Sequence, residues 1–350
     1  MREDGPTDDP ARVLALADLA TPMALRVAAT LRIADQVAGG ARTAPALADA
    51  VHADADALDR VLRHLVTVGV LGSDGAGGYA LTTVGGPLRS DHPHSVRARL
   101  DIDGPLGRAD QSFVQLLHAV RTGRAGFPAQ FGRTFWEDLS ADATRTEAFD
   151  AMMGADVAAH APAVVAALDW GTLGHIVDVG GGNGTLVVAL LRAFPALHGT
   201  VLDLPGAARA AGVVLEEAGL SGRAGAVAGS FFDPLPPGAD GYLLCEVLHN
   251  WDDAAATAIL RRCAEAARPD GRVLVVERVP SDGDAVDTAR GLLMLAYFGG
   301  RERDLGELTA LAARAGLAPV AVHGAGAGSV IELAVTRNEA LPGGNGGGHP

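Results

Sequence analysis

The sequence predicts an α/β protein of two domains, in which a mainly helical N-terminal part precedes a parallel-type sheet with helices on both faces. The first observation is length: the chain has 350 residues, whereas single hydrophobic cores stop growing near about 250–300 residues. The second is the spacing of apolar residues at a helical period in residues 11–38. The third is the alternation of short buried strands with helices from His175 onward, which is typical of parallel sheets.

Composition narrows the classes of function. The chain carries 28 basic and 42 acidic residues, a formal net charge of −14, and such a surface repels nucleic-acid phosphates and anionic lipids. It contains no lysine, which excludes P-loop NTPases, pyridoxal-phosphate enzymes and kinases that depend on one. Cys245 and Cys263 lack metal-type spacing, and no apolar leader or membrane-length apolar run is seen, so a reducing cytoplasm is expected.

The N-terminal elements follow from apolar spacing and capping residues. Pro22 is expected to split or kink the first helical run. The predicted elements are, in order, helices within residues 11–38, a short helix from Thr43, a helix capped by Asp54 or Asp56 that runs to Thr67, and strands at 68–71 and 79–81 around a turn at 72–78. This order is a winged-helix outline.

The winged-helix outline is expected to serve dimer packing and not DNA binding. Residues 43–72 carry four Asp and two Arg, so the helix that would contact DNA is acidic. The apolar stripe from Val13 to Leu31 has no obvious partner within one compact domain, and such stripes usually mark interfaces. We therefore expect a homodimer through the N-terminal domain.

Residues 85–170 are expected to be mostly helical, with a looser connection that carries Phe127, Phe131, Phe135 and Trp136. Because only 4% of the chain is aromatic, this concentration stands out. Two interpretations are equally favoured: ordinary core filling, and the wall of a pocket for a flat substrate.

The C-terminal part alternates strands and helices and closes with two strands. Predicted strands occupy residues 176–179, 200–202, 241–248, 272–276, 317–322 and 330–336, and predicted helices occupy 185–194, 206–218, 254–267, 285–297 and 305–315. The boundary with the preceding helical part is expected near Trp170.

The strongest functional motif lies where the first of these strands turns into a helix. Asp178 is followed by glycines at 180, 182 and 184, which let the backbone approach a ligand at the N-terminus of a helix. This D-x-G-x-G-x-G spacing differs from the dinucleotide fingerprint G-x-G-x-x-G. It resembles the S-adenosylmethionine site of class I methyltransferases, in which the acid faces the amino end of the ligand. Asp203, at the end of the second strand, can accept both ribose hydroxyls.

Two further strand ends carry motifs. One is the strand end between the predicted strands at 200–202 and 241–248, which is followed by Gly229-Ser230-Phe231-Phe232, where Phe231 could cover the adenine edge. The other is the end of the strand predicted at 241–248, which leads into His249-Asn250-Trp251. On these motifs the sequence resembles the small-molecule O-methyltransferase family, typified by plant caffeate and flavonoid enzymes and by actinobacterial natural-product methyltransferases.

The resemblance implies residue roles. The family's catalytic base is the His that matches His249, and the family's Trp that packs against the cofactor matches Trp251. Two carboxylates that flank the family's His match Glu277 and Glu302, and which of them orients the ring is left open. Met294 matches a Met that touches aromatic substrates.

The expected site also contains departures from the family pattern. Ser230 stands where the family has an Asp that binds adenine, Cys245 where plant members carry Lys, and Gly291 where an Asp is common. These departures bear on the details of cofactor contacts. The residues expected to bind the cofactor are Asp178, Gly180, Gly182, Asp203, Leu204, Ser230, Phe231, Cys245 and Trp251, and those expected to contact the substrate are Phe131, Trp136, Met153, Asn250, Met294 and Phe298.

The resemblance covers nearly the whole chain and implies a Rossmann-like class I methyltransferase domain behind a winged-helix dimerisation domain. The predicted parts are a disordered tail at 1–10, the dimerisation domain at 11–100, a helical connection to the substrate pocket at 101–170, the S-adenosylmethionine-binding domain at 171–338 and a disordered Gly-rich tail at 339–350.

We expect a cytoplasmic S-adenosylmethionine-dependent O-methyltransferase that acts on a phenolic hydroxyl of an aromatic natural product such as a polyketide, with S-adenosylhomocysteine as product. A His base makes a divalent cation unnecessary, and no carboxylate cluster with metal spacing accompanies the motifs, so no metal is expected. One alternative is a relative that binds the cofactor but catalyses hydroxylation or decarboxylation, against which His249 argues. Others are a ligand-responsive winged-helix regulator and a nicotinamide oxidoreductase. The sequence does not name the acceptor.

Overall fold

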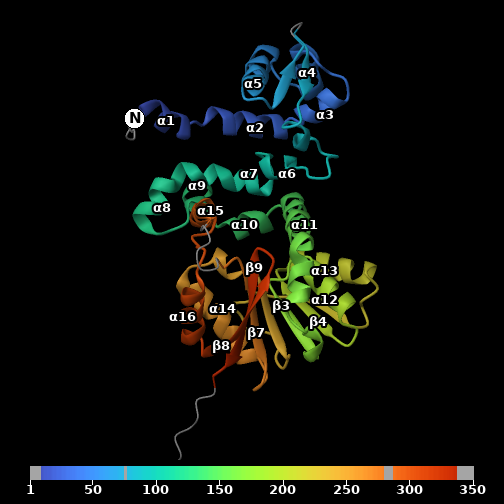
Figure 1. The fold of residues 1–350 in the computed structure, drawn as a ribbon, viewed down its shortest axis with the longest axis vertical. Coiled ribbons are helices and arrows are strands. Elements are labelled where there is room, and N and C mark those ends of the chain that lie inside the picture. The colour runs from blue at the N-terminus through green and yellow to red at the C-terminus, as the bar shows by residue number, and fades with distance from the viewer. Residues whose placement is uncertain (1–8, 75–76, 280–286, 337–350) are drawn as a thin grey trace, which may run out of the picture. The chain divides into compact units, whose positions relative to one another are not determined.

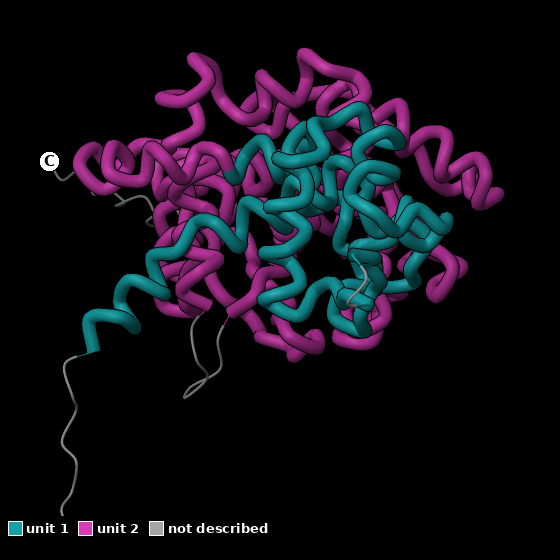
Figure 2. Tube along the Cα trace, turned by 90° about the horizontal axis from the view of Figure 1, so that it is seen from above, with its two compact units in different colours: residues 1–110 teal, residues 111–350 magenta. Residues whose placement is uncertain are grey.

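The structure is a computed structural model that describes residues 9–74, 77–279 and 287–336. Apart from Asp9 and Pro10, the predicted tails at 1–10 and 339–350 lie outside the described residues. The chain divides into two compact units, Met1–Asp110 and Gln111–Pro350 (Figure 2). The predicted helical connection at 101–170 falls mainly in the second unit.

The first unit is helical apart from one small hairpin (Figure 1). Its elements are α1 (Pro10–Leu16), α2 (Ala20–Thr30), α3 (Ile33–Ala38), α4 (Ala44–Val51), α5 (Ala55–Thr67), β1 (Leu71–Ser73), β2 (Tyr79–Leu81), the 3-10 turn η1 (Gly86–Leu88), α6 (Arg97–Leu100) and α7 (Pro105–Asp110). Ile33, Leu47 and Leu62 are among the side chains that form its core. The predicted caps of α4 and α5 are present, since the side chain of Thr43 accepts from the Ala46 N–H and that of Asp54 from the Ala57 N–H.

The break in the first helical run was predicted at Pro22, and this was wrong. The helix ends at Leu16 and restarts at Ala20, because the carboxylate of Asp18 accepts hydrogen bonds from the N–H groups of Ala20 and Thr21. Pro22 lies in the first turn of α2, where its missing N–H has no intrahelical bond to make.

The first hairpin strand was also misplaced. It was predicted at residues 68–71, but α5 continues to Thr67 and Val68 is its C-cap. Gly69 then takes a left-handed backbone, with φ at +76°, and the strand starts at Leu71. The apolar run was long enough to suggest a strand, and the glycine C-cap was not recognised.

The helices at the N-terminus expose an apolar face. Val13, Leu14, Leu16 and Leu19 are 66% to 80% exposed. By length and composition alone, the run from Pro10 to Thr30 is apolar enough to cross a membrane, with a mean hydropathy of 1.4, which the sequence analysis did not anticipate. The run is not one continuous helix, because the backbone leaves helical geometry between Leu16 and Ala20.

The second unit contains the α/β domain. Its elements are the 3-10 turn η2 (Gln111–Gln115), α8 (Leu116–Thr122), α9 (Gly126–Phe131), α10 (Phe135–Ser140), α11 (Ala143–Ala167), η3 (Trp170–Thr172), β3 (His175–Val179), α12 (Thr185–Ala193), β4 (His198–Asp203), α13 (Pro205–Glu217), β5 (Ala224–Ala228), β6 (Gly241–Cys245), η4 (Leu248–Asn250), α14 (Asp253–Ala266), β7 (Arg272–Glu277), α15 (Thr288–Tyr297), α16 (Leu305–Arg314), β8 (Leu317–Ala325) and β9 (Gly328–Val335).

The described sheet of this unit has the strand order β5-β4-β3-β6-β7-β9-β8. The first five strands are parallel, and β9 runs antiparallel to both β7 and β8. The predicted fold class is confirmed, although the antiparallel end was not predicted. Strand order reverses at β3, with β4 on one side and β6 on the other, and such open sheets bind ligands beyond the carboxyl ends of the strands at this point.

Two predictions in this unit need correction. The segment around Phe127 and Trp136, predicted as a looser connection, forms the short helices α9 and α10, and a capping box at Thr134 and Glu137 starts α10. The strand predicted at 241–248 ends at Cys245, because Glu246 has a left-handed φ of +55° and the chain then forms η4. Residues 285–286 of the helix predicted at 285–297 lie outside the described residues.

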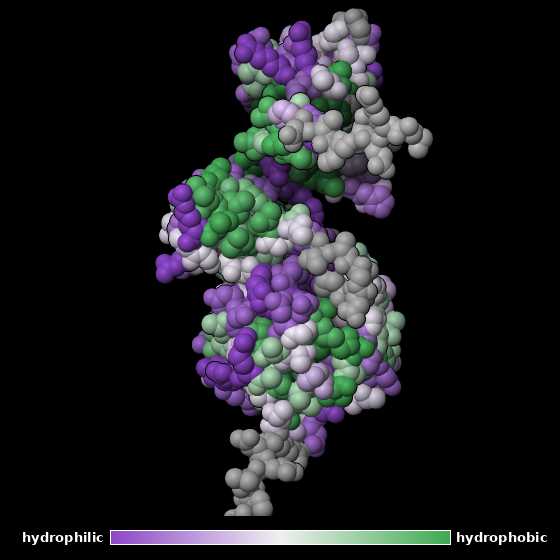
Figure 3. All heavy atoms as spheres, turned by 60° about the vertical axis from the view of Figure 1, so that its left-hand side comes forward, coloured by the Kyte–Doolittle hydropathy of each residue, from purple (hydrophilic) through white to green (hydrophobic). Residues whose placement is uncertain are grey.

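A second apolar patch lies on η2 and α8. Val114, Leu117 and Val120, spaced three residues apart, are 61% to 72% exposed. Figure 3, in which the left-hand side of Figure 1 comes forward, shows hydrophobic side chains gathered in the part of the chain where α8 lies. These three side chains therefore form an exposed apolar stripe.

Candidate active site at the carboxyl edge of the sheet

The glycine loop between β3 and α12 forms an open cradle. Gly180, Gly182 and Gly184 have φ values of +76°, +57° and +79°, which non-glycine residues rarely adopt. A Cβ added at Gly182 would meet no heavy atom within 4 Å. A ligand can therefore approach the backbone at the N-terminus of α12, as the motif predicts.

Asp178, at the end of β3, is a buried acid with an unsatisfied oxygen. It is 1% exposed, and within the described part of the chain Oδ1 has no hydrogen-bond partner. Burial, and then the nearby charge of Asp203, raises the pKa of Asp178 to about 7. A buried polar atom without a partner is costly, so the site fits a ligand that brings a cation or a hydrogen-bond donor.

Asp203 lies beside this cradle at the end of β4. Its Oδ2 accepts from the Gly182 N–H at 2.8 Å and its Oδ1 accepts from the Leu204 N–H at 2.6 Å. Burial raises the pKa of Asp203, and the two backbone donors oppose that rise. Each carboxylate oxygen has two lone pairs, so capacity remains for two ligand hydroxyls.

Asp150 of α11 is a further acid here that sequence reasoning missed. Burial, and then the charge of Asp203, raises the pKa of Asp150 to about 6. Its backbone carbonyl accepts a hydrogen bond of 3.4 Å from the side chain of Asn183 in the glycine loop. A Cβ at Gly154 would lie 2.3 Å from the same Asn183 side chain. Close packing of α11 on the glycine loop thus explains why Asp150 lies at this site. No local motif in the sequence marks this residue.

Aromatic rings border the loop. The rings of Phe231 and Trp251 meet edge to face at 5.7 Å, and a Cβ at Gly180 would be 3.4 Å from Phe231. The hydroxyl oxygen of Ser230 accepts from the Phe232 N–H at 3.2 Å. The predicted cofactor residues after the third and fourth strands therefore lie together in space.

Cys245 ends β6 with a neutral side chain. Its Sγ lies 3.9 Å from Nε2 of His160. Burial, and then the negative charges of Asp178 and Glu246, raises the pKa of the Cys245 thiol well above its ordinary value. The thiol therefore stays uncharged and cannot replace a lysine as a cation.

His249 is held in η4 by Glu277 of β7. The side chain of His249 is buried, and its Nδ1 lies 2.7 Å from Oε2 of Glu277. The other oxygen, Oε1, accepts from the backbone N–H groups of Leu248 and His249 at 2.8 and 3.3 Å. One carboxylate thus fixes both the backbone turn and the ring. Burial lowers the pKa of His249, but the charge and hydrogen bond of Glu277 outweigh it, so the pKa is raised.

Glu302 has a different partner. Its Oε1 accepts from Nε of Arg290 at 2.5 Å, and Nη2 of Arg290 donates to Oε2 of Glu246 at 2.6 Å. The same Nη2 lies 3.4 Å from Nε2 of His249. The alternative left open by the sequence is resolved geometrically: Glu277 contacts the His249 ring, and Glu302 contacts Arg290. Arg290 and Glu246 were missed, because their importance depends on pairing between segments far apart in the chain.

The segment Gly300-Arg301-Glu302-Arg303 supports the same turn. The buried Arg303 donates from Nη1 to the Leu248 carbonyl at 2.9 Å and from Nη2 to the Trp251 carbonyl at 2.7 Å. A Cβ at Gly300 would lie 2.1 Å from the His249 carbonyl oxygen, so glycine is required for this approach. The carbonyls on both sides of His249 are therefore fixed from α15's C-terminal side.

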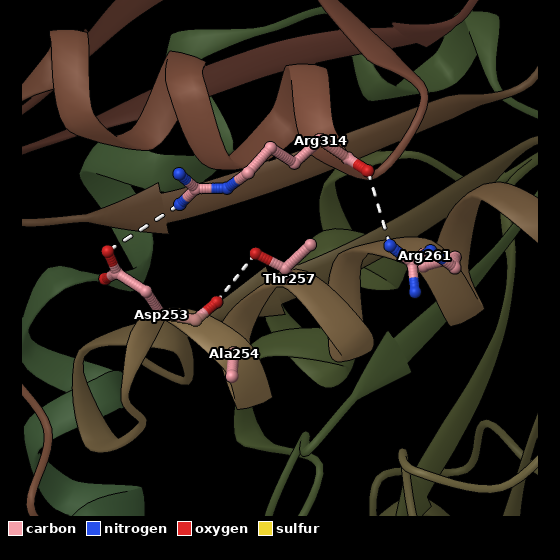
Figure 4. A pocket seen from close by; sticks show the side chains of 5 residues that line it. All are labelled: Asp253, Ala254, Thr257, Arg261 and Arg314. Atoms are coloured by element: carbon pink, nitrogen blue, oxygen red, sulfur yellow. Dashed lines mark hydrogen bonds and ion pairs between the residues drawn. The ribbon is translucent and has the colours of Figure 1, made fainter.

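A surface hollow of about 380 Å³ adjoins this support. It is lined by Asp253, Ala254, Thr257, Arg261 and Arg314. Figure 4 shows Arg314 reaching toward Asp253, with a nitrogen-to-oxygen distance of 3.6 Å. Asp253 also accepts from Arg303 at 3.0 Å, so this hollow backs the His249 turn and contains none of the predicted site residues.

The residues predicted to contact the substrate come from several helices. The rings of Trp136 and Phe298 stack at 5.3 Å, and Phe131 packs against Phe127 at 4.6 Å. Met294 is buried in α15. The side chain of Asn250 donates to the Glu246 carbonyl at 3.4 Å. Aromatic packing thus joins α9, α10 and α15, while Met153 lies on α11.

The described part of the chain contains no cluster of potential metal ligands. Within residues 9–74, 77–279 and 287–336, no three His, Cys, Asp or Glu side chains are placed to hold a metal ion.

Two family models match the chain. An O-methyltransferase dimerisation domain matches residues 14–88, and an O-methyltransferase domain matches residues 113–318.

Curated relatives are similar over almost their whole length. The chain is 54% identical over 319 residues to a 2,7-dihydroxy-5-methyl-1-naphthoate 7-O-methyltransferase of Streptomyces carzinostaticus, covering 91% of this chain and 96% of that protein. It is 43% identical over 353 residues to aclacinomycin 10-hydroxylase RdmB of Streptomyces purpurascens, covering 96% and 94%.

Solved structures match as well. The O-methyltransferase NcsB1 from neocarzinostatin biosynthesis, in complex with S-adenosylmethionine and 2-hydroxy-5-methyl naphthoic acid, has a TM-score of 0.89 and 52% identity, covering 94% of this chain and 100% of that chain. Its complex with S-adenosyl-L-homocysteine and 1,4-dihydroxy-2-naphthoic acid has a TM-score of 0.90, with 52% identity and coverage of 95% and 100%.

Proposed function

The chain belongs to the O-methyltransferase family, and on that premise we propose that it methylates a phenolic hydroxyl of a naphthoate-type aromatic natural product, with His249 as the base. The O-methyltransferase activity and the cofactor S-adenosylmethionine are those that the sequence predicts. The observation that carries the proposal is the buried pair of His249 and Glu277, with Nδ1 and Oε2 2.7 Å apart at the carboxyl edge of the sheet.

The chemistry assigned to His249 follows from its two ring nitrogens. A phenol with a pKa near 10 is only about 0.1% ionised at pH 7, so a base raises the fraction of reactive oxygen. Glu277 accepts a hydrogen bond from Nδ1–H, and this tautomer leaves Nε2 without hydrogen and able to take the hydroxyl proton. The same carboxylate stabilises the imidazolium that forms. S-adenosylmethionine supplies the methyl group, bound to a positively charged sulfur.

The cofactor residues are proposed from the cradle. Asp178 offers a buried acceptor to the amino end, and Asp203 offers acceptor capacity to the ribose hydroxyls. Gly182 leaves room for backbone contact. Phe231 and Trp251 supply the apolar border, and Gly180, Leu204, Ser230 and Cys245 complete the proposed set. Ser230 and Cys245 contribute only neutral groups, so we assign them positioning by shape and neutral hydrogen bonds.

The acceptor class rests on the aromatic cluster and on the relatives. Ring contacts through Phe127 and Phe135 connect Phe131 of α9 and Trp136 of α10 with Phe298, the C-cap of α15, and Met294 lies on α15 itself. Flat side chains favour a flat substrate. The 54% identical relative is named for a dihydroxy-methyl-naphthoate, and we propose an acceptor of that kind. Asn250 and Met153 are proposed as further contacts.

Hydroxylation is the second candidate, favoured by one observation, the 43% identity to an aclacinomycin 10-hydroxylase. Hydroxylation needs no base within reach of a phenol, so the fixed His249 favours methyl transfer. Two observations oppose the regulator alternative. The helix of the winged-helix outline that would contact DNA is acidic, and a methyltransferase domain matches residues 113–318. We assign the enzyme to the cytoplasm, consistent with Cys245 and Cys263 being free thiols.

We also propose a homodimer through the N-terminal unit. Residues 14–88 match a dimerisation domain. Leu14 and Leu16 of α1 and Leu19, the N-cap of α2, are 74% to 80% exposed. Isolated apolar faces of this kind are covered in stable proteins by a partner.

The first prediction concerns the acceptor. The enzyme is incubated with S-adenosylmethionine and either 2,7-dihydroxy-5-methyl-1-naphthoic acid or 1,4-dihydroxy-2-naphthoic acid, and the products are analysed by mass spectrometry. We expect a mass gain of one methyl group. The matched control is 2-naphthoic acid, which lacks a hydroxyl and should not react. Oxygen incorporation without methylation would instead support the hydroxylase candidate.

The second prediction concerns His249. Because only the neutral ring accepts a proton and Glu277 raises the pKa of His249, kcat/KM should rise with pH through a midpoint above 6.5, the ordinary pKa of histidine. Glu277→Gln should move this midpoint down, since it removes the charge that stabilises the imidazolium. His249→Ala should lower kcat by about 10²–10⁴-fold with cofactor affinity retained. His198→Ala, an exposed histidine of the same unit, is the control. A flat pH profile with an active His249→Ala enzyme would contradict the assignment of the base.

The third prediction concerns Asp178. Its pKa of about 7 belongs to the free protein, and a cationic ligand binds the ionised form, so cofactor affinity should fall as pH drops below about 7. Calorimetry should show this fall for the wild type and, for Asp178→Asn, a weaker affinity without the fall near pH 7. Asp233→Asn, which changes an exposed acid of the same unit, should behave as the wild type. Equal affinity of Asp178→Asn and the wild type would remove Asp178 from the site.

The fourth prediction concerns the dimer. The double substitution Leu16→Glu and Leu19→Glu places charges at the exposed apolar end of α1 and at the N-cap of α2, and it should convert the dimer to a monomer in light scattering. Val213→Glu, at another exposed apolar position, should leave the dimer intact. A wild-type chain that is monomeric would refute the proposal.

A further inference from the structure

Arg290 is a half-buried cation that has no role in the proposed mechanism. It lies on α15, whose N-cap Asp287 accepts a hydrogen bond of 3.0 Å from the backbone N–H of Arg290 itself. Its Nε donates to Glu302 at 2.5 Å and its Nη2 donates to Glu246 at 2.6 Å. Because the guanidinium is planar, two such bonds fix the orientation of the whole group.

The fixed guanidinium points at the reacting atom of the base. Nη2 carries two hydrogens. One is used by Glu246, and Nη2 lies 3.4 Å from Nε2 of His249. When Glu277 holds the proton on Nδ1, Nε2 is an acceptor, so Arg290 donates toward the atom that must receive the proton of the acceptor.

One oxygen atom beside this pair can lie within hydrogen-bond distance of both nitrogens. Hydrogen bonds of about 2.8 Å from one oxygen can reach both of two atoms that are 3.4 Å apart. A hydroxyl in that position donates its hydrogen to Nε2 of His249 and accepts a hydrogen bond from Nη2–H of Arg290. The neutral ring nitrogen thus acts as an acceptor and the guanidinium as a donor.

We propose that Arg290 is a second catalytic residue, whose Nη2–H donates to the acceptor oxygen while His249 takes the proton from that oxygen. The inference rests on the proposed function and deepens it. The O–H bond breaks and its proton goes to Nε2, and the electron pair left on oxygen forms the bond to the methyl group. The bond between that methyl group and the sulfur of S-adenosylmethionine breaks, and its electron pair goes to the sulfur, which gives neutral S-adenosylhomocysteine. Arg290 keeps all its hydrogens throughout, because it only stabilises the charge that develops on oxygen.

The surrounding charges keep this donor from holding the oxygen too strongly. Glu246 and Glu302 offset the positive charge of Arg290, and Arg278 pairs with Glu246 at 3.3 Å from its exposed side. The charged groups that face the His249 ring are Glu277 from β7, Arg290 from α15 and Glu246 from the end of β6. A partly neutralised guanidinium favours ionisation of the hydroxyl without abolishing its reactivity.

The first test is kinetic and uses the naphthoic acid that is methylated in the acceptor experiment. Arg290→Met should lower kcat by about 10²-fold, as loss of one donor to a developing oxyanion does. It should also move the acid limb of kcat/KM to higher pH, because removing a positive charge beside His249 favours its imidazolium. The loss should shrink for acceptors with more acidic hydroxyls. Arg192→Met, which removes an exposed cation of α12 in the same unit, should leave rate and pH profile unchanged.

The second test does not depend on turnover. With S-adenosylhomocysteine bound, the absorbance of the bound naphthoic acid should show ionisation of its hydroxyl at lower pH in the wild type than in Arg290→Met. Added methylguanidinium should restore rate and ionisation to Arg290→Ala, and Arg290→Lys should be intermediate. Cofactor affinity and melting temperature report whether each variant is folded.

The outcomes separate the two proposals. A wild type that methylates no acceptor contradicts the proposed function, and the inference falls with it. A wild type that methylates, together with a folded Arg290→Met enzyme whose rate, pH profile and bound-acceptor ionisation are unchanged, overturns the role of Arg290 alone. If Arg290→Met is unfolded, Arg290→Lys decides: wild-type rate and ionisation in that variant would likewise overturn the role.

Discussion

The carboxylate of Glu277 is the constraint on which the active site depends. Its two oxygens bind three groups of the turn that follows β6: the N–H groups of Leu248 and His249 and the ring nitrogen Nδ1 of His249. Since Glu277 ends β7, which pairs with β6, the sheet itself sets the position of His249, the proposed base. Gly300 and Arg303 secure the same turn from its other side. The ring is therefore fixed before any substrate arrives, as preorganised catalysis requires.

The proposed cofactor side and the proposed acceptor side of the site differ in whether their charged groups already have partners of opposite charge. On the cofactor side, Asp178, Asp203 and Asp150 lie near one another with raised pKa values, burial being the main cause in each. This state is suited to a cationic ligand that brings its own charge. On the acceptor side, Glu277 and Arg290 already balance charge around His249. On the proposed cofactor side, a bound ligand supplies a partner that Asp178 lacks. On the proposed acceptor side, the oxygen of the substrate binds beside His249 and Arg290, which already have carboxylate partners.

Sequence reasoning reached the strand–helix alternation, the glycine cradle, Asp203 and His249, because each is marked by local spacing or by a motif at a strand end. The choice between Glu277 and Glu302 as the partner of His249 was left open, because it depends on contacts between distant segments. It did not reach Arg290, whose importance arises from ion pairs with two residues distant in the chain. It placed the break of the first helix at Pro22, because proline is a stronger breaking signal in a sequence than an aspartate that can cap a helix. In the structure Asp18 caps α2, and Pro22 is tolerated in the first turn of that helix. It extended β6 past Cys245, because no apolar pattern signals the left-handed backbone of Glu246.

The central claim is that Glu277 holds the His249 ring with hydrogen on Nδ1 and none on Nε2. Nitrogen-15 NMR of histidine-labelled enzyme, with the His249 signals assigned by their loss in His249→Asn, measures this directly. Above the pH midpoint of the rate, the account predicts a protonated Nδ1 and an unprotonated Nε2, and below it protons on both nitrogens. In Glu277→Gln, the transition should move to lower pH. A neutral His249 with hydrogen on Nε2 would contradict the account, since that ring could not accept the proton of the acceptor.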